Sequence, residues 1–75
     1  MREDQKQYFL QLGLTVAYYR KARKLTQEKL AEKVGISRNH MSRIETADCA
    51  ASLDVIFDIA KALEITPDKL FRSIE

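Results

Sequence analysis

The chain has 75 residues, which leaves room for only one small domain, because protein domains commonly contain roughly 100 to 200 residues. One cysteine and one histidine exclude an internal disulfide and leave too few soft ligands for a structural zinc site. A hydrophobic fraction of 45%, a charged fraction of 32% and a net charge of +2 indicate a globular protein rather than a disordered or membrane-spanning chain. We therefore expect a single cytoplasmic domain, residues 1–75, with no cofactor, no membrane contact and no small-molecule ligand.

The first predicted helix covers residues 4–24, where apolar side chains recur at three- and four-residue steps. These side chains form one stripe along the helix, made of Tyr8, Phe9, Leu12, Val16 and Tyr19. Gly13 lies within the stripe, where glycine weakens a helix by about 1 kcal/mol relative to alanine. We expect another part of the chain to pack closely against the helix at Gly13.

A second helix is predicted to begin after Thr26, whose hydroxyl can accept a hydrogen bond from the first free amides. Its inward-facing residues are Leu30, Ala31 and Val34. Gly35 follows them directly and suits the left-handed conformation in which many helices end.

A third helix is predicted over residues 38–45, because Ser37 can cap it and its only apolar residues are Met41 and Ile44. The two short helices are joined so tightly that they cannot lie antiparallel and must cross at a steep angle. Residues 26–45 are therefore predicted to form a helix-turn-helix.

Ser52 is expected to cap a fourth helix over residues 53–63, and Thr66-Pro67 is expected to open a fifth. The predicted apolar face of the fourth helix consists of Leu53, Ile56, Phe57, Ala60 and Leu63. The apolar residues of the fifth are Leu70, Phe71 and Ile74. No segment shows the alternation of a strand, so the predicted fold is all-α, a compact five-helix bundle.

Charge is distributed unevenly along the chain. Residues 20–43 carry eight Lys and Arg against two Glu, whereas residues 44–75 carry three Lys and Arg against seven Asp and Glu. Such asymmetry in a small domain suggests one face that binds a polyanion. The alternative interpretation is that scattered lysines only solvate the helices.

The outer face of the third helix carries Arg, Asn and Ser side chains. If Met41 and Ile44 face inward, Asn39 and Arg43 face outward, one turn apart, with Arg38 at the start of the helix. Arginine can bridge O6 and N7 of guanine, and asparagine can bridge N6 and N7 of adenine. The pattern predicts contacts with base edges in the major groove, and the alternative is a solvated helix face.

The stretch LGLTVAYYRKARKLTQEKLAEKVGISRNHMSRIE, followed by SLDVIFDIAKALEITPDKLF, resembles the Cro/repressor-type helix-turn-helix family, also called the xenobiotic-response-element family. The resemblance extends over residues 12–71 and combines about a dozen spaced positions. It implies a lambda-repressor-like DNA-binding domain and a sequence-specific transcriptional regulator. It also implies a homodimer that binds a palindromic double-stranded operator, with the last helix or its surroundings at the dimer contact.

The resemblance also implies roles for individual residues. Arg20 and Glu45 match a structural ion pair, and Gln27 matches a position that buttresses the third helix and bonds a phosphate. The residues predicted to contact bases are Arg38, Asn39, His40 and Arg43. The residues predicted to contact phosphates are Gln27, Lys29, Lys33, Ser37 and Ser42.

The loop after Glu45 departs from the family pattern, which often has a glycine and one or two basic residues there. This chain has Thr46-Ala47-Asp48-Cys49-Ala50-Ala51, and a carboxylate at Asp48 would repel a phosphate. Attraction to the DNA backbone is therefore expected to depend more on Lys21, Lys24, Lys29 and Lys33.

Three further features each allow two interpretations. His40 either contacts DNA and makes binding pH-sensitive, or is a solvated side chain. Cys49 is either a redox sensor or, without a basic neighbour or second thiol, a small core or loop residue. The aromatic residues of the first helix either stack on bases or form core and dimer contacts.

Catalysis requires a nucleophile with its base, a pair of carboxylates or a metal within a pocket, and the sequence assembles none of these. We therefore predict that the protein is not an enzyme. The alternative to a DNA-binding regulator is an antitoxin-like or protein-interaction module whose main partner is another protein.

Overall fold

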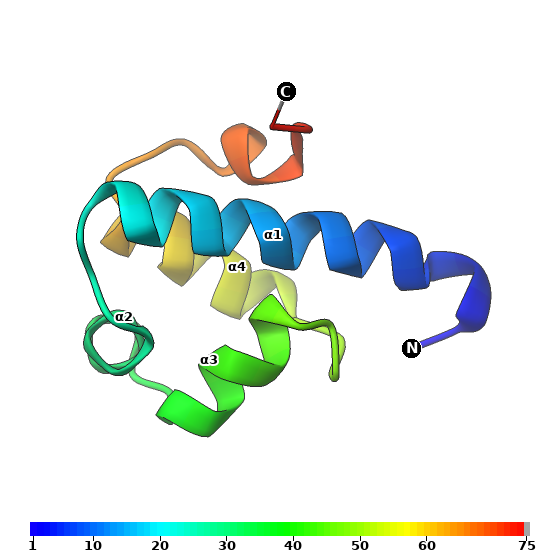
Figure 1. Ribbon diagram of the computed structural model, residues 1–75, viewed down its shortest axis with the longest axis horizontal. Coiled ribbons are helices and arrows are strands. Elements are labelled where there is room, and N and C mark those ends of the chain that lie inside the picture. Colours follow the sequence, from blue (N-terminus) through cyan, green and yellow to red (C-terminus); the bar gives the residue numbers. More distant parts are fainter. Residues whose placement is uncertain (75) are drawn as a thin grey trace.

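In the computed structural model, which describes residues 1–74, the chain forms four α-helices and two short 3-10 helices (Figure 1). The elements are η1 (Glu3–Gln5), α1 (Lys6–Ala22), α2 (Gln27–Val34), α3 (Arg38–Glu45), α4 (Leu53–Ala62) and η2 (Pro67–Phe71). These residues contain no strand, so the predicted all-α class is confirmed. α1 runs across the molecule with η2 on one side and α2 and α3 on the other. None of the described helices is long and apolar enough to span a bilayer.

The prediction of a fifth α-helix is wrong, because the chain after Thr66 forms only the short 3-10 helix η2. The hydroxyl of Thr66 caps no amide; it hydrogen-bonds the Asp68 carboxylate and thereby lowers the pKa of that group. Pro67 lacks an amide hydrogen, and so short a segment gains few hydrogen bonds to offset the cost of helix nucleation. Leu70 is fully buried and fixes η2 to the core. The protein is thus a four-helix domain with a 3-10 turn near its end.

The predicted helix starts are confirmed by three side-chain caps. Thr26 accepts from the Lys29 amide at 3.0 Å, Ser37 accepts from the His40 amide at 3.0 Å, and Ser52 accepts from the Val55 amide at 3.3 Å. Each cap satisfies an amide that has no partner within its helix. The caps explain why α2, α3 and α4 begin at the predicted positions, whereas α1 is shorter than the predicted 4–24 and is preceded by η1.

Each α-helix is followed within two residues by a residue in the left-handed backbone conformation. Gly35 follows α2 with φ of 89° and donates its amide to the Ala31 carbonyl at 2.8 Å, as predicted. The residues after the other three helices are not glycine: Lys24, Ala47 and Glu64 have φ of 57°, 60° and 58°. A side chain with Cβ is strained in this conformation, so three of the four helix ends store strain.

The core is formed by side chains from all four α-helices and from η2. Its buried residues are Leu12, Val16, Leu30, Ala31, Met41, Ile44, Ile56, Ile59, Ala60, Leu63 and Leu70. The predicted faces are wrong at Tyr8, Leu53 and Phe57, which are 67%, 62% and 49% exposed. On α4 the buried positions centre on Ile56, and Phe57 is about 100° further around the helix. The sequence pattern alone admitted both faces, and packing against the other helices selects one.

The predicted close approach at Gly13 is confirmed. A methyl group built on Gly13 would lie 2.6 Å from the carbonyl oxygen of Ile44 and would also meet the main chain of Glu45. The absence of a side chain on α1 therefore lets the last turn of α3 pack directly against the α1 backbone.

The contrast between the two glycines provides a stability test. Gly13→Ala should destabilise the fold by about 3 kcal/mol, because the atoms that it meets are main-chain atoms that cannot rotate away. Gly35→Ala should cost only about 1 to 2 kcal/mol, since the space is open and only the positive φ opposes it. Urea denaturation of both variants measures the two values. Equal stability of Gly13→Ala and the wild type would contradict the close packing of α1 on α3.

Candidate nucleic-acid interface

α3 has one buried face and one exposed face. Met41 and Ile44 are 0% and 2% exposed, whereas Arg38, Asn39 and Arg43 are exposed, as the helical spacing predicted. Two other predicted contact residues of α3, His40 and Ser42, are half-buried. α3 lies at the edge of the molecule in Figure 1, on the opposite side of α1 from η2, so its outer face is open to a large partner.

A buried ion pair fixes the last turn of α3 to α1. Arg20 Nε donates to Glu45 Oε2 at 2.7 Å, and Arg20 Nη2 donates to Glu45 Oε1 at 3.1 Å, which makes the pair bidentate. Both residues are buried, with 9% and 8% of their surface exposed. Arg20 Nη1 also donates to the Leu25 carbonyl at 2.8 Å, and therefore holds the loop between α1 and α2. The pair implied by the family resemblance is present, and Arg20 is a structural residue.

Gln27 joins the same network from the first turn of α2. Its side-chain Nε2 donates to Glu45 Oε1 at 2.9 Å, so α1, α2 and α3 all meet at one carboxylate. The buttressing role that the resemblance implies for Gln27 is therefore present in the structure. Its contact with a phosphate stays a prediction.

The other predicted phosphate contacts lie on α2 and at the start of α3. Lys29 and Lys33 are exposed, and Lys29 Nζ lies 3.6 Å from Glu32 on the same helix. Ser37 uses its hydroxyl oxygen as the cap of α3, so its hydroxyl hydrogen remains available to a phosphate. Lys21 and Lys24 are exposed near the end of α1.

A contact that sequence reasoning missed joins Arg43 to the loop after α3. Arg43 Nη2 lies 3.4 Å from the main-chain carbonyl oxygen of Asp48, and the Asp48 amide donates to the Arg43 carbonyl at 2.8 Å. Ala47 permits this turn by adopting a positive φ of 60°. No residue type signals a bond to a main-chain carbonyl, so the sequence could not reveal it.

The remaining candidates are dispersed. Cys49 is half-buried and packs against the core, in agreement with the interpretation that it is a small core residue. Tyr18 and Tyr19 meet edge to face with ring centroids 5.2 Å apart, and Arg23 lies 5.9 Å from the centre of the Tyr19 ring. Tyr8 is exposed near the other end of α1. The aromatic residues of α1 are thus spread along the helix and do not form one stacking platform.

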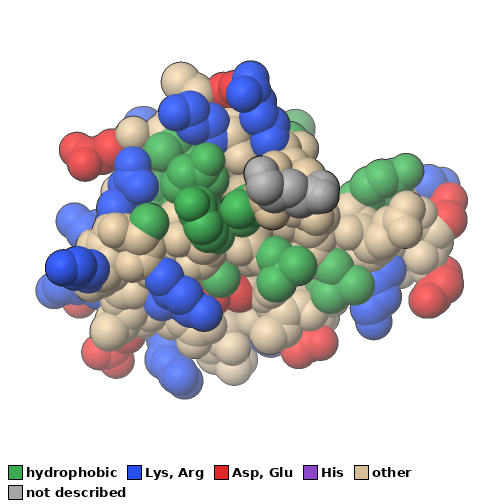
Figure 2. All heavy atoms as spheres, turned by 45° about the horizontal axis from the view of Figure 1, so that its top comes forward, with side chains coloured by type: hydrophobic (Ala, Val, Ile, Leu, Met, Phe, Trp, Pro, Cys, Tyr) green, Lys and Arg blue, Asp and Glu red, His purple; other side chains and the backbone are tan. Residues whose placement is uncertain are grey.

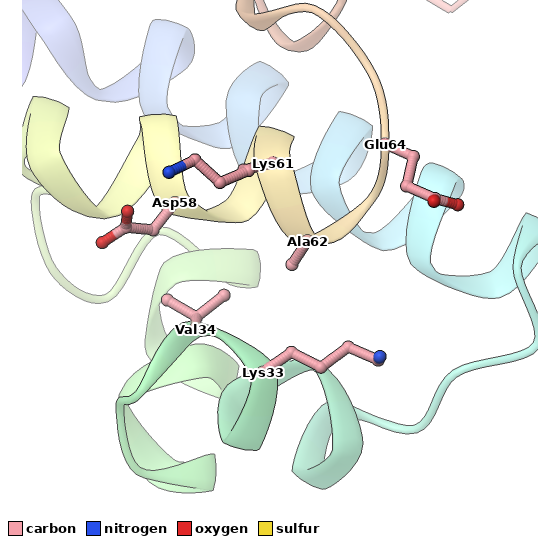
Figure 3. A pocket seen from close by; sticks show the side chains of 6 residues that line it. All are labelled: Lys33, Val34, Asp58, Lys61, Ala62 and Glu64. Carbon is pink, nitrogen blue, oxygen red and sulfur yellow. The ribbon is translucent and has the colours of Figure 1, made fainter.

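An open groove of about 590 Å³ lies between α2 and α4 (Figure 3). It is lined by Lys33, Val34, Asp58, Lys61, Ala62 and Glu64. Figure 3 shows Lys61 extending towards the same side as Asp58 and Lys33 towards the same side as Glu64. The two positive and two negative side chains give the groove no net charge with which to select an anion. Within residues 1–74, no three His, Cys, Asp or Glu side chains gather as metal ligands would.

The buried pair can be tested with a double-mutant cycle. Arg20→Ala and Glu45→Ala should each destabilise the fold by about 3 kcal/mol, because each leaves a buried charge without its partner. The double variant should be less destabilised than the sum, since neither charge is then left alone. Chemical denaturation of the three variants gives the coupling free energy. Strict additivity would show that the two side chains do not interact in solution.

Comparison with known proteins agrees with this geometry. Residues 16–70 match the HTH_3 helix-turn-helix family. An uncharacterized HTH-type transcriptional regulator of Methanocaldococcus jannaschii is 41% identical over 54 residues, which are 72% of this chain and 82% of the relative. The restriction-modification controller protein C.AhdI from Aeromonas hydrophila has a similar structure, with a TM-score of 0.82 and 33% identity over 84% of this chain and 96% of that one. The P22 c2 repressor, solved in complex with a synthetic operator, matches with a TM-score of 0.75 and 28% sequence identity, over 81% of this chain and 92% of the repressor chain. The chain therefore belongs to the Cro/repressor-type helix-turn-helix family of DNA-binding transcriptional regulators.

Proposed function

We propose that this regulator binds a palindromic DNA operator as a homodimer, with α3 of each subunit in the major groove. The observation that carries the proposal is the exposed face of α3, which the buried Arg20–Glu45 pair holds at a fixed angle to α1. A preformed helix favours binding to a duplex, because ordering the helix on binding would cost free energy. The P22 c2 repressor, which has a similar fold, was solved in complex with a synthetic operator.

The proposed base contacts come from four residues of α3: Arg38, Asn39, His40 and Arg43. The first turn of a recognition helix lies deepest in the groove, which favours Arg38 and Asn39 for direct reading. Arg43 is one turn beyond Asn39 on the same side and can reach a neighbouring base pair. Guanine suits the two arginines and adenine suits the asparagine.

The proposed phosphate contacts surround this face. They are Gln27, Lys29, Lys33, Ser37 and Ser42. Lysines give a salt-dependent attraction that does not depend on sequence, whereas the half-buried Gln27 and the exposed Ser37 fix the position of the DNA strand. Since these groups act on any duplex, they place the protein on DNA but do not choose the operator.

We propose that a second copy of the chain packs against the exposed apolar side chains. Figure 2 shows hydrophobic side chains between Lys and Arg on the face that carries α1 and η2. Phe71 and Ile74 are exposed although they follow the buried Leu70, and Leu53 and Phe57 are exposed on α4. Two recognition helices in such a dimer would meet successive major grooves about 34 Å apart, so the operator should contain half-sites about 10 base pairs apart.

A cytoplasmic, non-catalytic role is part of the same proposal. A double-stranded DNA operator is the proposed partner, and the family is one of regulators rather than of enzymes. The groove between α2 and α4 is open and lacks a nucleophile paired with a base. Control of transcription requires only binding, and no chemical step is assigned to any residue.

Base reading by Arg43 can be separated from backbone attraction. Arg43→Ala should weaken operator binding by about 1 to 3 kcal/mol and relax the preference at one base pair in each half-site. Lys29→Ala should weaken binding to all duplexes alike and lower the slope of log K against log salt by about one per contact removed. Selection of duplexes from a random pool, followed by salt titrations, measures both effects. An unchanged selected sequence for Arg43→Ala, with only the salt slope altered, would make Arg43 a phosphate contact instead.

The proposed dimer predicts twice the 8.7 kDa chain mass at tens of micromolar in multi-angle light scattering. Phe71→Asp should lower that mass towards one chain, because a carboxylate in a buried contact must lose its hydration. The mass of one chain for the wild type, both with and without operator DNA, would rule out the dimer.

A further inference from the structure

The loop after α3 holds a carboxylate at the end of the recognition helix. The Thr46 hydroxyl oxygen lies 3.0 Å from the Ser42 carbonyl oxygen and 3.1 Å from Asp48 Oδ2. The positive φ of Ala47 turns the chain back, and the Asp48 amide donates to the Arg43 carbonyl at 2.8 Å. Main-chain and side-chain bonds therefore both fix the place of Asp48 relative to α3.

Fold stability does not explain a negative charge at this position. A carboxylate at the C-terminal end of a helix meets the negative end of the helix dipole, which disfavours it. No Lys or Arg within residues 1–74 forms an ion pair with Asp48. The neighbouring Arg43 approaches the main-chain carbonyl of Asp48 at 3.4 Å rather than its carboxylate. Asp48 thus keeps an exposed and unneutralised charge beside a residue of the proposed DNA face.

We propose that Asp48 is a negative determinant of DNA binding, held in place by Thr46. The inference rests on the proposed function, in which the N-terminal turn of α3 lies deep in the groove and its C-terminal end faces the flanking phosphates. There the Asp48 carboxylate repels the backbone and opposes the sequence-independent attraction of the lysines. Binding of DNA at this end of α3 then depends on a base contact by Arg43 rather than on the positive charge of Arg43.

The test measures binding of two 30-base-pair fluorescent duplexes by anisotropy at several salt concentrations. One duplex carries the sequence selected by the wild-type protein, and the other has a scrambled sequence. Asp48→Asn should strengthen binding to both by roughly three- to tenfold and steepen the salt dependence. Asp48→Lys should strengthen it again by a similar factor. The selected sequence should not change, because the main-chain carbonyl near Arg43 remains in both variants.

Variants of Thr46 test whether its hydroxyl positions the Asp48 carboxylate. Thr46→Val removes the hydroxyl that lies beside the carboxylate, so the freed Asp48 should turn towards solvent and binding should strengthen by less than in Asp48→Asn. In the Asp48→Asn background, Thr46→Val should have no further effect. Thr46→Ser keeps the hydroxyl and should bind like the wild type.

Glu3→Gln is the matched control for overall charge. Glu3 is an exposed acid of η1, before the start of α1, and forms no ion pair within residues 1–74 (Figure 1). It lies outside the proposed DNA and dimer contacts, so its neutralisation should leave binding to both duplexes unchanged. Wild-type affinity for both duplexes in a folded Asp48→Asn protein would overturn this inference and leave the proposed function intact. A wild-type protein that selects no sequence from the random pool and does not bind the scrambled duplex at low salt would overturn both. Equal affinities of Asp48→Asn and Asp48→Lys would show that loop geometry, not charge, limits binding.

Discussion

The bidentate contact between Arg20 and Glu45 determines the orientation of α3 relative to α1. The oxygens of one carboxylate accept from the guanidinium of α1 and from the amide of Gln27 in α2, so three helices meet at the end of α3. A buried ion pair contributes little net stability unless its polar atoms all find partners, because both charges lose their hydration. Here that condition is met: within residues 1–74, no buried side-chain nitrogen or oxygen lacks a hydrogen-bond partner. We interpret the pair as the element that sets the angle of α3, while apolar packing supplies most of the stability.

Apolar packing and polar geometry act on opposite faces of the same eight-residue helix. Met41 and Ile44 attach α3 to the core, and their burial leaves Asn39 and Arg43 on the outside. Gly13 allows the backbone of α1 to touch the end of α3, so the ion pair forms across a very short distance. A side chain at Gly13 would push α3 outward and tilt the proposed DNA-binding face. The orientation of the proposed recognition surface is therefore set largely by buried residues behind it.

Features with local causes were predictable from the sequence. The caps at Thr26, Ser37 and Ser52 depend on a side chain and an amide three residues later, and both can be seen in the chain order. The orientation of α3 followed from two apolar residues on an otherwise polar helix. The family resemblance added the Arg20–Glu45 pair, whose two residues are 25 positions apart and have no local signal of their own.

The errors arose where tertiary packing decides between alternatives. Leu53 and Phe57 fit an apolar stripe of α4 as well as Ile56 does, and only the placement of α4 against α2 and η2 selects the buried face. The fifth helix had a plausible start at Thr66-Pro67, but the Thr66 hydroxyl bonds to Asp68 instead of to an amide. DNA contacts, the dimer and the effect of Asp48 depend on partners outside the chain, and they stay predictions.

The left-handed residues at the helix ends also affect how the protein responds to its ligand. Lys24, Ala47 and Glu64 each hold a conformation that glycine would adopt without strain, and each lowers the free energy of unfolding of a domain whose core is small. A ligand that binds only the folded state adds stability in proportion to the logarithm of its free concentration. In a cell, the folded fraction of such a regulator, and with it the exposure of its chain to proteases, would therefore follow the number of free operator sites. Occupancy of DNA would then influence the lifetime of the protein as well as the transcription of a gene.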